Sequence, residues 1–110
     1  MTRRPDITEA QFQRQVEALL KQYGWKFYHT HDSRRSVPGF PDLIAVRGHL
    51  MLALELKVGY AKPTPEQVEW LQALDKVYGV QAMVIRYSKD MSQLEALLSE
   101  ADLPDLPFAW

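Results

Sequence analysis

The feature that most limits how this chain can fold is the apolar run Leu50–Leu54, which continues directly into Glu55, Leu56 and Lys57. Its residues are hydrophobic at consecutive positions rather than at every second one, which indicates a strand buried on both faces at the centre of a sheet. Such a strand rarely carries unpaired charges. Glu55 and Lys57 at its end therefore need an explanation.

Glu55 and Lys57 are two residues apart, a spacing at which side chains project from the same face of a strand. A second carboxylate, Asp42, follows Pro41 and lies thirteen residues before Glu55. Mg²⁺ takes oxygen ligands, usually including one or two protein carboxylates, and can polarise a phosphate and activate water. An amine beside that water can orient it, help to deprotonate it or balance the developing charge. The three side chains therefore suit a metal-dependent phosphodiesterase.

Each of these two motifs also has a purely structural interpretation. Glutamate and lysine at this spacing are common on exposed strands, and Pro41-Asp42 is an ordinary turn pair. The apolar residues before Glu55 favour the functional interpretation, because a buried strand is an unusual place for surface charges.

Length and composition limit the class of protein. With 110 residues, of which 46% are hydrophobic and 25% charged, residues 1–110 are expected to form one domain with a single core. The absence of cysteine excludes disulfides and thiolate zinc sites. No apolar run approaches the roughly 20 residues of a membrane span, and the start lacks the apolar stretch of a secretory signal. We therefore expect a cytoplasmic protein with no membrane partner.

The formal net charge of −1 argues against a broadly basic protein that binds nucleic acid non-specifically. Attraction to phosphate must then come from local clusters of positive charge. Two are present: Arg34 and Arg35 with Lys26 upstream, and Lys57 with Lys62. The arginine pair also fits an ordinary solvated loop.

Periodicity and capping signals predict three helices and four strands. The helices are expected over residues 8–22, from 64 to about 78, and over 91–100; the strands are expected over 25–31, 42–47, 50–57 and 81–87. Thr8–Gln11 and Thr64–Gln67 have the capping-box pattern, and Gly24 and Gly79 are the expected helix stops. The short turn at Gly48 predicts an antiparallel hairpin.

The element order αβββαβα predicts an α/β protein of the α+β kind. The first three strands are expected to form an antiparallel meander, and the fourth to lie parallel to the third through a right-handed crossover. This arrangement gives an αβββαβ core with a mixed four-stranded sheet flanked by helices, followed by a C-terminal helix.

With these residues placed, the sequence resembles the restriction-endonuclease-like PD-(D/E)xK nucleases. Among them it resembles the small stand-alone form of the virus-type replication-repair nuclease (VRR-NUC) domain, from the first helix to the fourth strand. Each motif alone is a weak indication of the family, but their combined order and spacing are specific. They are Gly24-Trp25, His31-Asp32-Ser33-Arg34-Arg35, Gly39-Phe40-Pro41-Asp42-Leu43, Glu55-Leu56-Lys57 and Thr64-Pro65-Glu66-Gln67.

The resemblance implies a metal site and its ligands. Asp42 and Glu55 are expected to bind the catalytic Mg²⁺ or Mn²⁺, the main-chain carbonyl of Leu56 to complete the protein ligands, and Lys57 to position the attacking water. The choice between one metal and two stays open. The family also places an acidic residue on the first helix near the metal.

Helical periodicity selects Glu9 for that acidic residue. A helical wheel places Glu9 beside the hydrophobic stripe of the first helix and Glu17 toward water, with Gln13 between them as the next candidate. We therefore expect Glu9 to face inward as a catalytic residue and metal ligand. A simpler role is also open, because a carboxylate in the first turn complements the positive end of a helix.

The second helix contributes Gln67 to the expected site. Its wheel places Gln67 on the same face as Val68, Leu71, Leu74 and Tyr78. Members of the family carry a glutamine near the active site at this place, and the third position of a capping box also suits glutamine. Both roles can coexist.

Histidine and aromatic residues have less specific interpretations. His29 and His31 share one strand face, and a nearby site of hard oxygen ligands favours His31 as a contact to DNA or phosphate rather than as part of a histidine metal pair. Packing is the alternative for both. Four aromatic residues are expected in the core: Trp25, Phe27, Trp70 and Tyr78.

These residues and the resemblance together predict a Mg²⁺- or Mn²⁺-dependent deoxyribonuclease. Its expected substrate is branched DNA, such as a Holliday junction, in replication, recombination or repair. We expect a homodimer, because two cuts in one junction need two sites. No helix-turn-helix or other base-reading module is recognisable, which favours recognition of DNA shape. The expected DNA contacts are His31, Ser33, Arg34, Arg35 and Lys62.

Two other functions fit the sequence. One is a non-catalytic DNA-binding or assembly module on the same fold; the presence of Asp42, Glu55 and Lys57 argues against it, because buried charges are costly. The other is a restriction-type endonuclease with base-specific contacts, which would cut linear duplex at a defined sequence. The small form suggests a phage or prophage gene, acting in the cytoplasm of a bacterial host.

Overall fold

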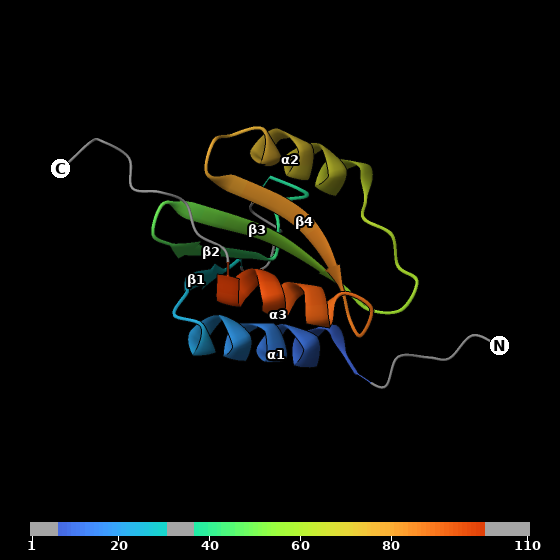
Figure 1. The fold of residues 1–110 in the computed structure, drawn as a ribbon. Helices are drawn as coiled ribbons and strands as arrows, with labels where there is room; N and C mark the ends of the chain where they lie inside the picture. Colours follow the sequence, from blue (N-terminus) through green and yellow to red (C-terminus); the bar gives the residue numbers. More distant parts are fainter. Residues whose placement is uncertain (1–6, 31–36, 101–110) are drawn as a thin grey trace.

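The computed structural model describes residues 7–30 and 37–100, which form three helices and four strands (Figure 1). The predicted element order is confirmed. The helices are α1 (Glu9–Gln22), α2 (Pro65–Asp75) and α3 (Met91–Glu100). The strands are β1 (Lys26–His29), β2 (Leu43–Arg47), β3 (Leu50–Lys57) and β4 (Val80–Arg86).

The four strands form one mixed sheet in the order β1-β2-β3-β4. β1, β2 and β3 are antiparallel neighbours, and β4 runs parallel to β3 after the crossover through α2. α1 and α3 lie side by side on one face of the sheet, while α2 covers β4 and β3 from the other face (Figure 1). The predicted α+β fold is confirmed. Within the described part of the chain, no helix is long and apolar enough to cross a membrane.

β3 is the central strand, as its continuous apolar run predicts. Six of its eight residues, Leu50 and Leu52 to Leu56, are buried, because helices cover both faces of the sheet at this position. α1 and α3 complete the core on one side. Their fully or almost fully buried residues are Phe12, Val16, Leu20, Leu94 and Leu98.

Both predicted capping boxes are present. The hydroxyl oxygens of Thr8 and Thr64 accept hydrogen bonds from the main-chain N–H groups of Gln11 and Gln67, at 3.1 and 3.2 Å. In return, each glutamine Oε1 accepts from the main-chain N–H of its threonine, at 2.8 and 2.9 Å. These bonds satisfy helix N–H groups that have no partner within the helix, so α1 and α2 begin where the sequence predicts.

The predicted end of the second helix, near residue 78, is wrong: α2 ends at Asp75. The Asp75 carboxylate accepts a hydrogen bond from the main-chain N–H of Ala82 at 3.0 Å, which ties the helix end to β4. A turn follows, and Gly79, with φ of 82°, reverses the chain into the sheet. Tyr78 therefore lies beyond the helix and is 72% exposed rather than part of the core.

The other aromatic predictions and the first strand need smaller corrections. Trp25 is buried, Phe27 packs against the core, and Trp70 is half-buried. Trp25 precedes the strand rather than starting it, because its main-chain N–H still bonds the Leu20 carbonyl of α1 at 2.8 Å. β1 therefore begins at Lys26. The strand also ends earlier than predicted, at His29, and His31 lies outside the described residues.

Gly39 sets how the segment before β2 approaches α2. Its φ is 92°, and a Cβ atom built on it would lie 2.5 Å from the Glu66 carbonyl carbon and 2.8 Å from the Gln67 nitrogen. Only glycine allows this conformation and this approach together. The contact fixes the distance between the start of α2 and the nearby Pro41-Asp42.

We predict that Gly39→Ala destabilises the fold more than Gly24→Ala does. Both glycines have positive φ, so each substitution incurs the left-handed strain of about 1 kcal/mol. Gly24 has no atom within 4 Å of an added Cβ, whereas Gly39 meets the backbone of α2. Urea denaturation should show a free energy of unfolding about 1–3 kcal/mol lower for Gly39→Ala than for Gly24→Ala. Equal losses of unfolding free energy in the two variants would contradict the close contact between Gly39 and α2.

Candidate active site

Three chain segments bring their charged and polar side chains together at one edge of the sheet. The antiparallel register pairs Leu43 with Leu54, so Asp42, one residue before β2, faces Glu55 near the end of β3. Lys57 ends β3 on the same side as Glu55. Gln67 reaches the group from the first turn of α2. The site predicted from separate motifs is therefore one cluster.

Asp42 is held in place by main-chain hydrogen bonds. Its Oδ2 atom accepts from the Leu56 N–H at 2.8 Å, which ties the carboxylate across to β3. Its carbonyl accepts from the Thr30 N–H at 2.9 Å, and the Thr30 hydroxyl donates to the Pro41 carbonyl at 2.8 Å. The carboxylate is half-buried and oriented before any ligand binds.

Glu55 is the buried charged side chain at the centre of the cluster, with 1% exposure. Its Oε2 atom lies 3.3 Å from the Lys57 ammonium and accepts a hydrogen bond from Gln67 Nε2 at 3.0 Å. Its Oε1 atom is buried and has no hydrogen-bond partner among the described residues. An orphaned carboxylate oxygen in such a position is costly, which indicates that it serves a ligand.

The surroundings raise the pKa of Glu55 to about 7. Burial is the largest cause, because it disfavours the charged carboxylate, and the negative charge of Asp42 adds to it. The ammonium of Lys57 acts in the opposite direction but does not cancel these effects. A cation placed between the two carboxylates would relieve both causes.

The donor set fits a hard divalent cation. Two carboxylates, one of them with a free buried oxygen, are the number that Mg²⁺ usually takes from a protein, leaving positions for water and phosphate. Thiolate and imidazole groups, which favour softer metals, are not involved. Among the described residues, no group of three or more histidine, aspartate or glutamate side chains could hold a metal ion. Within residues 7–30 and 37–100, the pair Asp42 and Glu55 is therefore not joined by a third such ligand.

Gln67 both caps α2 and contacts Glu55 of the candidate site. Its Oε1 atom accepts from the Thr64 N–H, which leaves Nε2 to donate to Glu55. The cap thus fixes the orientation of the amide, because the two ends of the side chain have opposite hydrogen-bonding character. The start of α2 is coupled in this way to the buried carboxylate.

The expectation that Glu9 faces inward is wrong. Glu9 is exposed, one turn before the buried Phe12. A helical wheel predicts the direction in which a side chain points. It does not show whether the sheet extends far enough to cover a side chain at the end of the helix. Gln13 and Glu17 are instead half-buried, and Gln13 Nε2 donates to Glu17 Oε2 at 2.8 Å, so Glu17 does not simply face water.

The predicted DNA contacts are only partly within the structure. Lys62 is exposed on the loop that joins β3 to α2. Arg86 holds this loop: its Nη1 atom donates to the carbonyls of Gly59 and Ala61 at 2.8 and 2.7 Å. The remaining predicted contacts, His31, Ser33, Arg34 and Arg35, lie outside the described residues.

Sequence reasoning missed Arg86 and Thr30, which support the site without belonging to a motif. Arg86 pairs with Lys57 in the parallel register, and Thr30 directly follows β1 and bonds the Asp42 carbonyl. The supporting roles of Arg86 and Thr30 can be recognised only once it is known which strands are neighbours. The Pro38-Gly39 pair was a visible signal for a turn, but its contact with α2 requires the tertiary structure.

Protein stability should report the buried state of Glu55. A carboxyl with a raised pKa in the folded state stabilises the fold below its unfolded pKa of 4.5, and this contribution is lost as the pH rises through about 7. Unfolding should be measured in EDTA at pH 4.5 and at pH 7.5. Between these two pH values, the free energy of unfolding should fall by on the order of 2 kcal/mol more for the wild type than for Glu55→Gln. Exposed Glu69→Gln is the control. Parallel pH profiles for wild type and Glu55→Gln would contradict the assignment.

Comparisons with known proteins agree with this geometry. No protein-family model matches the sequence, and no curated protein matches it significantly. Solved structures do match. A VRR_NUC domain protein superposes with a TM-score of 0.63 and 26% identity, over 84% of this chain and 88% of the other.

A second solved structure is the Holliday junction resolvase Hjc of Archaeoglobus fulgidus. It matches with a TM-score of 0.54 and 25% identity, over 71% of this chain and 68% of the resolvase. Both neighbours are PD-(D/E)xK-type nucleases. The resemblance expected from the motifs is therefore confirmed: the chain has the PD-(D/E)xK nuclease fold and is similar to VRR_NUC domain proteins.

Proposed function

We propose that the chain is a Mg²⁺- or Mn²⁺-dependent DNA endonuclease that cuts branched DNA. The observation that carries this proposal is the pair Asp42 and Glu55 beside Lys57, with a buried Glu55 oxygen that has no partner in the described structure. The similarity to a Holliday junction resolvase supports branched DNA as the substrate. The exposed Lys62 supports contact with the DNA backbone.

Asp42, Glu55 and the main-chain carbonyl of Leu56 would hold one cation. When bound, such a cation polarises the scissile phosphate and lowers the pKa of an attacking water. Asp42 is already oriented by the Leu56 N–H, and Gln67 holds Glu55. Lys57 pairs with Glu55 Oε2 at 3.3 Å, which holds its ammonium beside the cation site. From there the ammonium would orient the attacking water and stabilise the charge that develops on the phosphate oxygens.

The remaining sequence-based expectations extend this proposal. Arg34, Arg35, His31 and Ser33 would contact the DNA backbone near the site. A homodimer would place two such sites on one junction, so that both strands of the branch are cut. A restriction-type enzyme would instead require base-specific contacts, and a non-catalytic module would have no use for the partnerless oxygen of Glu55.

Lys57→Ala should reduce cleavage at least about 100-fold, because it removes the positive charge beside the scissile phosphate. The measurement is a gel assay with Mg²⁺ or Mn²⁺ on labelled linear, flap and four-way-junction DNA. Lys76→Ala, at the opposite end of α2, is the control and should cut normally. Wild-type protein that cuts none of these substrates would overturn the enzyme assignment, and normal cleavage by Lys57→Ala would overturn the site.

Gln67→Glu should raise the pH needed for cleavage. Glutamate still accepts the capping bond from the Thr64 N–H but places a second negative charge against Glu55 Oε2. The rising limb of the pH–rate profile should move to higher pH, with about tenfold lower activity at pH 7. Gln11→Glu makes the same change in the other capping box and should leave the profile unmoved. Identical pH–rate profiles for Gln67→Glu and Gln11→Glu would contradict the influence of residue 67 on Glu55.

A further inference from the structure

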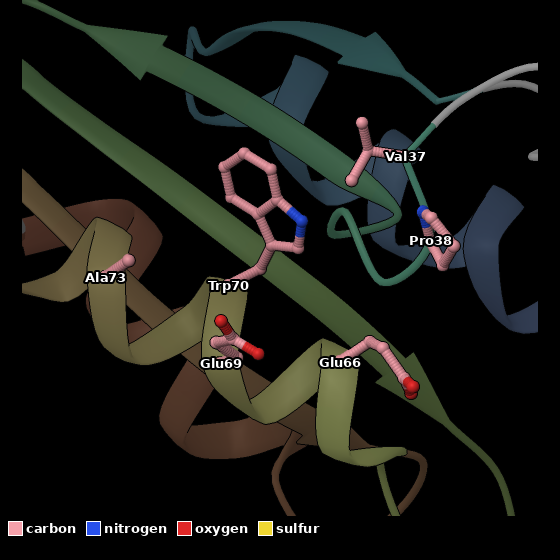
Figure 2. A pocket seen from close by; sticks show the side chains of 6 residues that line it. All are labelled: Val37, Pro38, Glu66, Glu69, Trp70 and Ala73. Atoms are coloured by element: carbon pink, nitrogen blue, oxygen red, sulfur yellow. The ribbon is translucent and has the colours of Figure 1, made fainter.

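A cavity of about 400 Å³ lies between α2 and the segment that leads into β2 (Figure 2). Figure 2 shows the indole of Trp70 rising from the helix opposite Val37 and Pro38, with its nitrogen turned toward them. Glu66, Glu69 and Ala73 form the helix side of the cavity. Its volume falls within the range of small-ligand sites.

The cavity adjoins the catalytic cluster across the first turn of α2. Gly39 packs against the backbone of Glu66 and Gln67, and Gln67 donates to Glu55 on the other side. The ring of Phe40 meets the Trp70 indole edge-on at 5.1 Å, which fixes that wall of the cavity. A group held here would therefore lie close to DNA engaged by Asp42 and Glu55.

The lining has the chemistry of a site for a flat, polar-edged ring. Trp70, Val37 and Pro38 provide apolar walls, and an indole offers both a face for stacking and an N–H donor. The carboxylates of Glu66 and Glu69 are acceptors that would repel phosphate but bind amino and ring N–H groups. A nucleobase combines an aromatic face with such an edge, and it is free to enter only when it is unpaired.

We propose that this cavity binds one unpaired nucleobase of the DNA substrate, next to the site of cleavage. The inference rests on the proposed nuclease function and narrows its substrate to DNA with an unpaired nucleotide at the branch. Stacking on Trp70 supplies affinity, because every base has an aromatic face. Glu69 and Glu66 favour bases that carry amino groups.

The test is binding to a flap DNA in EDTA, where a metal-dependent nuclease does not cut. 2-Aminopurine is placed in turn at each unpaired position, and matched flaps carry an abasic nucleotide there. At one position, wild-type protein should quench the 2-aminopurine fluorescence, and the abasic flap should bind about tenfold more weakly by anisotropy. The difference in affinity between the intact and the abasic flap should depend on an aromatic side chain at position 70. Trp70→Phe should keep this difference, and Trp70→Ala should abolish it.

Ala73 lines the cavity from an exposed position of α2, so Ala73→Leu adds bulk to the cavity and should remove both signals. Gln72→Leu places the same leucine side chain at the neighbouring exposed position, which does not line the cavity, and should keep both signals. Abasic flaps that bind as well as intact ones at every position, or Ala73→Leu protein that behaves as wild type, would overturn the inference.

Cleavage of the same intact and abasic flaps in Mg²⁺ separates this inference from the proposed function. Base-dependent quenching, with no cleavage of the flap, linear or four-way-junction DNA, would support the cavity and overturn the nuclease assignment. Cleavage that is indifferent to the abasic nucleotide would support the nuclease and overturn the cavity.

Discussion

The buried carboxylate of Glu55, at the end of the central strand, is the constraint on which the rest of the site depends. Burial and the negative charge of Asp42 raise its pKa to about 7, while Lys57 and Gln67 stabilise only one of its two oxygens. A fold that served stability alone would be expected to place an apolar residue here. The free oxygen makes the position favourable for a cation and unfavourable without one.

The surrounding elements hold this carboxylate in a defined place. The antiparallel register brings Asp42 opposite Glu55, and the capping box of α2 turns the Gln67 amide toward it. Gly39 allows the segment before β2 to touch the start of α2, which carries Gln67. Residues on both sides of this contact, Pro38 and Glu66, line the adjacent cavity. The candidate active site and the proposed base site therefore share the start of α2.

Most of the fold and the centre of the site could be predicted from the sequence. The apolar run of β3, the two capping boxes and the stop at Gly24 are local signals, and each determined an element correctly. Predictions failed where tertiary contacts decide: Asp75 ends α2 by bonding β4, and Glu9 lies exposed at the start of its helix. Thr30 and Arg86 could not be found, because their roles depend on strand neighbours rather than on any motif.

The central claim is that Asp42 and Glu55 together hold a catalytic cation, and diffraction from crystals soaked in Mn²⁺ tests it most directly. An anomalous difference map should show one strong peak within ligand distance of a carboxylate oxygen of Asp42 and of Oε1 of Glu55, which has no hydrogen-bond partner among the described residues. The same soak of Glu55→Gln crystals should show that peak lost or greatly weakened. A cation peak bound elsewhere, with the Asp42–Glu55 pair empty at saturating Mn²⁺, would contradict the account.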